Sequence, residues 1–344
     1  MKRSRPKTNS LFASSVKSVQ KSFSKSIRGF PPLLHFSAGC IALLGLVLVD
    51  LLWEQHSRLI LPPAWLALKY AVCFISLKWL YVRWLGPQIT WPRFVGSKAD
   101  IKSVEQKVFL GVEFLILSGA VTGAAGVLTY LTCAWPTPLI DPSLAQADRF
   151  MGFDWQAWFM IFSKPWLFVL LQNAYYSLFF QTILFVSWFS FWENKSRLYE
   201  VFWILSASVI VTAFAAGLWP AVGPVFAFER LLPLFDHFQP LGHKIFAQVT
   251  AIKGGIIPDF TKQGLTGIIT FPSFHTAMAV AFIYGFRRTG LLGYGIILLN
   301  IAVLISIPFV GNHYLTDMIA GFFVALLTII LVRIIKHVQP KSLP

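Results

Sequence analysis

Eight apolar segments, each of about the length needed to cross a bilayer, recur along this chain of 344 residues. They lie at roughly 33–53, 63–85, 108–134, 165–189, 199–219, 273–289, 291–310 and 313–336. A helix rises about 1.5 Å per residue, so about 20 residues span a hydrocarbon core of about 30 Å. Hydrophobic residues make up 56% of the sequence and charged residues only 12%. We therefore expect an all-α polytopic membrane protein with eight transmembrane helices.

The basic residues lie mainly on one side of these expected helices. If the N-terminus is cytoplasmic, inner segments hold 20 of the 29 Lys and Arg residues and outer loops hold seven. The excess is still 12 to seven without the N-terminal tail, although the outer loops are longer. Because Lys and Arg are enriched in cytoplasmic loops, we expect both termini to be cytoplasmic, in an inner or plasma membrane.

The net charge of +15 comes from these basic clusters beside apolar segments. Such clusters orient membrane proteins, and the sequence has no nucleic-acid-binding motif, so we expect no nucleic-acid partner. Cys40, Cys73 and Cys133 have neither paired nor metal-type spacing. We therefore expect no disulfide framework, no metal site and no cofactor. No obligate protein partner is evident.

The chain divides into four regions. Residues 1–32 are basic, and their apolar residues recur every three or four positions. An amphipathic helix on an anionic inner leaflet, a solvated tail and a transit peptide all fit this pattern. Residues 33–107 would add two helices to a six-helix core at 108–338, and residues 339–344 form a short tail.

An outer segment at 135–164 is rich in aromatic residues. Asp141 and Asp154 each resemble a helix start, which predicts two short amphipathic helices lying in the interface. They would either shape a lipid entrance or form an ordinary aromatic belt.

Two histidines mark one end of the last three helices. His275 opens the sixth apolar segment and His313 opens the eighth, 38 residues later. Two passes of about 19 residues return the chain to the same face, so both histidines should lie there. Pro272 favours one helix start and Asn312 could cap the other, which places each histidine in a first helical turn. Two such helix N-termini, with free N–H groups and positive dipole ends, would suit a phosphate.

Asp317 lies four residues after His313 and therefore on the same helical face. Its carboxylate can accept the Nδ1–H of His313, which leaves the Nε2 lone pair free as a nucleophile. A lone histidine near a membrane-helix end is more often a headgroup anchor, but the pairing and Asp317 favour chemistry here.

The Pro-Ser-Phe-His sequence at 272–275 and the His-Tyr-x-x-Asp sequence at 313–317 resemble two motifs of a known family. These are the second and third motifs of the type 2 phosphatidic acid phosphatase superfamily, in the subgroup that includes inositol phosphorylceramide synthases. The resemblance covers about residues 108–336.

The resemblance implies roles for four residues. His313 would be the phosphoryl-accepting nucleophile and Asp317 its orienter. His275 would protonate the leaving oxygen, and Ser273 would contact the phosphate.

The sequence departs from the superfamily pattern in its basic residues. Ile307 stands where the third motif usually has Arg, and the first motif, with its Lys and Arg-Pro, is absent. The loop at 220–270 occupies the place of that first motif. Arg230, as the basic residue nearest the helix end, and Lys253 are our candidates for binding phosphate from this loop.

These features predict a metal-independent lipid phosphatase or phosphotransferase that acts through a phosphohistidine at the non-cytoplasmic face. The expected site holds less positive charge than the superfamily pattern, because it lacks these basic residues. This favours phospholipid headgroup transfer of the inositol phosphorylceramide synthase type. Hydrolysis of a lipid phosphate monoester, such as phosphatidic acid or a polyprenyl diphosphate, is the alternative. A non-enzymatic lipid transporter is a rival from another class, although its ionisable groups would more often lie at mid-membrane.

Overall fold

The structure, a computed structural model, describes residue 48 and residues 98–192, 195–226, 241–255, 267–268 and 270–338. The basic N-terminal segment and, apart from Leu48, the first two expected membrane helices lie outside the described residues. All regular structure in the described ranges is helical, which confirms the all-α prediction.

Five of the described helices are long and apolar enough to cross a membrane. They are α4 (Lys98–Cys133), α7 (Pro165–Phe191), α8 (Lys195–Leu218), α12 (Leu291–Val310) and α13 (Leu315–Val338). A sixth, α11 (Phe274–Phe286), is apolar but shorter. Each of the last six predicted apolar segments coincides with one of these helices.

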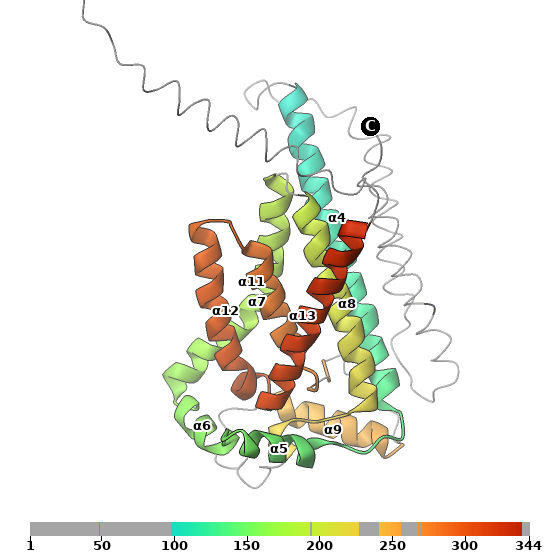
Figure 1. The fold of residues 1–344 in the computed structure, drawn as a ribbon, viewed down its shortest axis with the longest axis vertical. Helices are drawn as coiled ribbons and strands as arrows, with labels where there is room; N and C mark the ends of the chain where they lie inside the picture. Colours follow the sequence, from blue (N-terminus) through green and yellow to red (C-terminus); the bar gives the residue numbers. More distant parts are fainter. Residues whose placement is uncertain are drawn as a thin grey trace, which may run out of the picture.

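Helix α11 lies at the centre of the bundle and packs against α7, α8, α12 and α13 (Figure 1). Its small residues permit this, since Ala277, Ala279 and Ala281 are completely buried. A Cβ added to Gly285 would lie 2.7 Å from the ring of Phe185 on α7. Small residues at helix interfaces let membrane helices approach closely. The helix that carries His275 is therefore held by four neighbours.

Polar side chains join the helices inside the bundle. The side-chain amide of Asn300 on α12 donates to Oε1 of Gln181 on α7 at 2.7 Å, and the hydroxyl oxygens of Ser208 on α8 and Thr328 on α13 are 3.0 Å apart. Such interhelical hydrogen bonds stabilise helix pairs where hydrophobic burial alone gives no preference over lipid. Large apolar side chains face outward on the same helices, among them Phe179, Phe180, Leu298 and Phe323.

Short helices lie across the end of the bundle at which α11 and α13 begin (Figure 1). They are α5 (Asp141–Phe150), α6 (Trp155–Phe162), the 3-10 helix η4 (Pro224–Phe226) and α9 (Leu241–Lys253). The first two match the short helices expected in the aromatic segment. Asp154 caps α6 as predicted, because its carboxylate accepts the N–H of Ala157 at 3.1 Å.

The opposite end of the bundle holds a buried carboxylate among basic groups. Glu200 on α8 contacts Arg287 at the end of α11 at 3.4 Å and Lys336 near the end of α13 at 3.1 Å. Arg197 donates to the carbonyl of Gly285 at 2.9 Å. This network fastens α8, α11 and α13 together at the end far from the histidines.

Candidate active site

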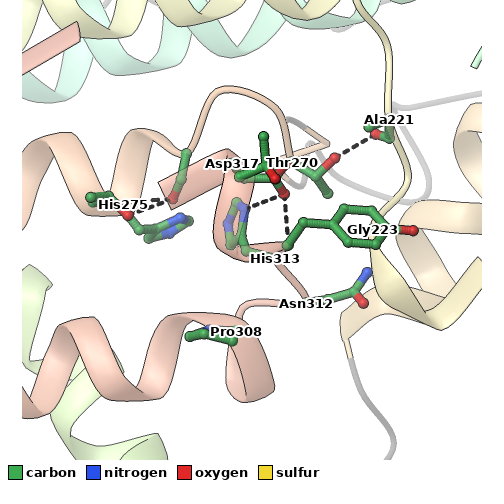
Figure 2. Close-up of polar contacts among 12 residues, drawn as sticks. Ala221, Gly223, Thr270, His275, Pro308, Asn312, His313 and Asp317 are labelled. Atoms are coloured by element: carbon green, nitrogen blue, oxygen red, sulfur yellow. Dashed lines mark hydrogen bonds and ion pairs between the residues drawn. The ribbon is translucent and has the colours of Figure 1, made fainter. Parts of the chain in front are cut away.

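The two histidines lie side by side at one end of the bundle. His275 is in the first turn of α11, and His313 comes two residues before α13. Their ring centroids are 5.9 Å apart with planes inclined by 64° (Figure 2). The 38-residue spacing therefore brings both imidazoles to one face, as the sequence predicts.

His313 is buried beside Asp317, and both side chains are at most 1% exposed. The Nδ1 atom of His313 lies 3.3 Å from Oδ2 of Asp317, and the same oxygen accepts the N–H of Tyr314 at 2.9 Å (Figure 2). Burial and, to a smaller extent, nearby His275 lower the pKa of His313 to about 3, against the opposing effect of a hydrogen bond to the Thr270 backbone. The imidazole is therefore neutral at pH 7, which is the state that a nucleophile requires.

His275 is held from α7 by Tyr175. The Tyr175 hydroxyl lies 2.8 Å from Nε2 of His275, and the ring centroids are 4.7 Å apart. Tyr175 is not predictable from the sequence, because it lies 100 positions from its partner in an apolar segment rich in aromatic residues.

Ser273 is completely buried as the N-cap of α11. Its Oγ accepts the N–H of Thr276 at 3.3 Å and lies 3.1 Å from the Thr276 hydroxyl. Its own N–H donates to the backbone carbonyl of Asp317 at 3.0 Å. A Cβ added to Gly321 would lie 2.2 Å from the Ser273 carbonyl, so α11 and α13 start in very close contact. Ser273 thus sets the relative position of the two helix starts.

The start of α13 differs from the expectation. Asn312, predicted as its cap, lies in the left-handed region at φ 57° and its side chain turns to the chain after α8. Asp148 of α5 takes the capping role, because its carboxylate accepts the N–H groups of Leu315 at 2.8 Å and Thr316 at 2.9 Å. His313 consequently precedes the helix. With Asp317 accepting the preceding N–H, these first donors of α13 are satisfied within the protein and are not free for an anion.

The segment after α8 is fastened to the turn that carries His313. Asp141 accepts the N–H groups of Val222 at 3.1 Å and Gly223 at 2.8 Å. Asn312 accepts the N–H of Val225 at 3.0 Å and donates to the Val222 carbonyl at 2.8 Å. Gly223 has φ 90°, and a Cβ there would lie 2.2 Å from the Asn312 carbonyl. The side chains of Asp141 and Asn312 therefore hold the loop after α8, and glycine at position 223 allows this loop to lie against Asn312.

Of the two predicted phosphate-binding residues, Arg230 and Lys253, the structure describes only Lys253. Arg230 lies outside the described residues. The ammonium group of Lys253 donates to the carbonyls of Trp135 at 3.1 Å and Thr137 at 2.8 Å. Burial lowers the pKa of Lys253. In this structure Lys253 binds the chain that follows α4, and reaching a substrate would require both hydrogen bonds to break.

Several carboxylates lie near Tyr314, the residue that follows His313 in the chain. Burial raises the pKa of Tyr314, and the charges of Asp141, Asp317 and Asp148 raise it further. Burial also raises the pKa of Asp141 to about 6, against the opposing effect of the N–H groups it accepts. Among the described residues, no group of three or more His, Cys, Asp or Glu side chains could hold a metal ion.

Comparison with known proteins gives one match. A family model described as the PAP2 superfamily matches residues 142–331, which is more than half of the chain. The matched range begins in α5 and includes both histidines and Asp317. No curated protein and no solved structure matches the chain.

Proposed function

Since the chain belongs to the PAP2 superfamily, whose members are phosphatases and phosphotransferases, we propose that it transfers a phosphoryl-bearing group from a membrane lipid through His313. The observation that carries this proposal is the contact of buried His313 with Asp317 at 3.3 Å, with His275 beside it. A neutral imidazole held through one nitrogen presents the other as a nucleophile.

In the first step, Nε2 of His313 attacks phosphorus and the bond to the lipid oxygen breaks. Asp317 holds the Nδ1 proton, so the ring becomes positively charged as the nitrogen–phosphorus bond forms, and the carboxylate stabilises that charge. His275 gives a proton to the departing alkoxide. The products are a phosphohistidine and a lipid alcohol such as diacylglycerol.

In the second step, water or another lipid's hydroxyl attacks the phosphorus of the phosphohistidine. His275 takes the proton of the attacking hydroxyl, and the nitrogen–phosphorus bond breaks to restore neutral His313. Water as the acceptor gives hydrolysis, and an alcohol gives transfer. No step in this scheme calls for a metal or another cofactor.

Charge at the site supports a phosphodiester donor. A phosphate monoester carries nearly two negative charges and a diester carries one, so a monoester needs more positive charge around it. Ile307, at the position where the superfamily's hydrolases usually have Arg, is completely buried in α12. The charged groups acting on Tyr314, beside His313, are carboxylates. The proposed donor is therefore a phospholipid whose headgroup phosphate passes to a second lipid's hydroxyl, as in an inositol phosphorylceramide synthase.

We place this reaction at the non-cytoplasmic face. The histidines lie at the start of α11 and next to the start of α13, and Arg287 and Lys336 lie at the other ends of these helices. Basic residues mark the cytoplasmic ends of membrane helices, which supports the proposed sidedness.

The proposal can be tested with purified protein in lipid vesicles. Phosphatidylinositol labelled in its headgroup phosphate should give an acceptor-dependent product with ceramide or diacylglycerol. Acid-labile label should remain on the protein after quenching, and His313→Ala should show neither product nor label. Rapid release of phosphate from phosphatidic acid, without an acceptor-dependent product from the diester, would instead identify a phosphatase.

A further inference from the structure

Tyr175 makes a contact that neither the sequence motifs nor the proposed reaction uses. Its side chain is 6% exposed, and its hydroxyl lies 2.8 Å from Nε2 of His275. The two rings also pack against each other, with centroids 4.7 Å apart and planes inclined by 32°. One face of His275 is therefore covered and one of its nitrogens is engaged.

The position of Tyr175 is fixed by the turn that precedes His313. A Cβ added to Gly311 would lie 2.9 Å from Cε2 of Tyr175 and 2.9 Å from Cδ2 of His313. Glycine at this position leaves the space in which both rings pack close to the turn. Tyr175 is thus held in place between the helix that carries His275 and the turn that carries the nucleophile.

The other nitrogen of His275 is in a different state. Its Nδ1 atom is buried and makes no hydrogen bond within the described part of the chain. A buried polar atom without a partner is unusual in proteins and is a candidate for a functional contact. Because the His313 ring lies 5.9 Å away, a phosphoryl group on His313 would lie close to His275.

We propose that Tyr175 is a positioning residue, which engages Nε2 of His275 and makes Nδ1 the nitrogen that exchanges protons with the substrate. This inference rests on the proposed function, because it assigns the acid to one atom of His275. Nε2 is the nitrogen farther from the backbone and is usually the more accessible one. The assignment of proton exchange to Nδ1 therefore depends on the contact between Tyr175 and Nε2.

The protons balance over the two steps, and the protonation state of Tyr175 does not change. In the acid step, doubly protonated His275 donates Nε2–H to the Tyr175 oxygen and gives its Nδ1 proton to the departing alkoxide. Neutral His275 keeps Nε2–H and has a lone pair on Nδ1. In the second step, Nδ1 takes the proton of the attacking hydroxyl as that oxygen bonds to phosphorus. Tyr175 neither loses nor gains a proton.

The experiment compares Tyr175→Phe with Tyr176→Phe on two substrates. Tyr176 is the adjacent residue, 55% exposed, and its ring touches Tyr175, so it controls for a change in local packing. One substrate is a phospholipid, whose alkoxide leaving group needs an acid. The other is an aryl phosphodiester with a weakly basic leaving group, which needs little protonation.

Tyr175→Phe should lower kcat/KM on the phospholipid by about 10- to 1,000-fold, within the range that general acid catalysis contributes. On the aryl diester the loss in kcat/KM should stay below about threefold, because kcat/KM reports only the first step and that step hardly needs an acid there. Tyr176→Phe should match the wild type on both. Equal losses on the two substrates, or no loss on the phospholipid, would overturn the role of Tyr175.

Two further measurements separate the possible failures. If His313→Ala is inactive while Tyr175→Phe behaves as wild type, only the Tyr175 inference fails; an active His313→Ala removes the proposed function itself. Nitrogen NMR of histidine-labelled wild-type protein tests the assignment without any variant. Neutral His275 should carry its proton on Nε2 and gain the second on Nδ1, and the reverse order would refute the proposal.

Discussion

Removing the carboxylate of Asp148 should loosen the start of α13 and the turn that carries His313. Asp148 is 2% exposed and belongs to α5, yet it accepts two backbone N–H groups of α13 and the Thr316 hydroxyl. Asp148→Ala would leave those donors unpaired at a buried helix end. Asp148→Asn would keep one acceptor oxygen and should have an intermediate effect.

The expected cost follows from the contacts that are lost. Replacing an N-cap side chain by Ala costs about 0.5–2 kcal/mol, and hydrogen bonds to charged groups contribute about 1.5–3 kcal/mol each. The cap cost already includes part of the hydrogen-bond contribution, so the two figures are not added in full. We expect Asp148→Ala to lower the free energy of unfolding by about 3 kcal/mol. At roughly 2–4 °C per kcal/mol, the Tm should fall by about 6–12 °C.

Asp154→Ala provides a matched control for this measurement. Asp154 caps the start of the short helix α6, but it is exposed and accepts a single N–H at 3.1 Å. Its loss should cost at most about 1 kcal/mol, because an exposed N–H can bind water instead. Thermal unfolding in detergent gives both values, and turnover should fall only in the Asp148 variant.

An equal Tm for Asp148→Ala and Asp154→Ala would contradict a stabilising role for the Asp148 carboxylate. An Asp148→Ala variant that is destabilised by the expected amount but keeps wild-type turnover would show that this cap does not determine the placement of His313. The first result would mean that the start of α13 tolerates the loss of this carboxylate, and the second that turnover does not depend on it.

Three other predictions address the site and its orientation. Asp317→Asn should lower kcat on the order of 10²- to 10⁴-fold with little change in Tm, because an amide can hold the wrong imidazole tautomer; undiminished turnover would contradict the orienting role. Asp141→Asn should gain stability relative to wild type as pH rises from about 4 to 7, since burial raises the pKa of Asp141 to about 6 and its ionisation then destabilises only the wild-type fold; a pH-independent difference in Tm would count against this. In a background without native cysteines, exposed Trp219→Cys should react with a membrane-impermeant maleimide in intact cells and exposed Arg288→Cys should not; the reverse pattern would place the site in the cytoplasm.

The features predicted correctly from the sequence depend on regular spacing. Two helical crossings of the membrane separate His275 from His313, so both lie at the same face. The helical period places Asp317 on the same side as His313. Both relations follow from covalent geometry and the bilayer thickness alone. The short helices α5 and α6 were also recognisable, because local signals at Asp141 and Asp154 mark helix starts.

The features that the sequence analysis missed depend on contacts between distant segments. Tyr175 and Asp148 lie 100 and 167 positions from the groups they bind, and no local pattern distinguishes them from their neighbours. Asn312 was assigned to the wrong partner for the same reason. Asparagine is a common N-cap residue, but the side-chain amide of Asn312 accepts the N–H of Val225 and donates to the carbonyl of Val222.

The Glu200 network has a mechanical consequence for the distance between the histidines. Helices α11 and α13 are stiff rods of about 20 and 36 Å, each with one histidine at or next to its start. Because Arg287 and Lys336 both bind Glu200 at the far end, neither rod can slide along its axis without breaking an ion pair to α8. One carboxylate thus keeps the two rods in register from the opposite side of the bundle.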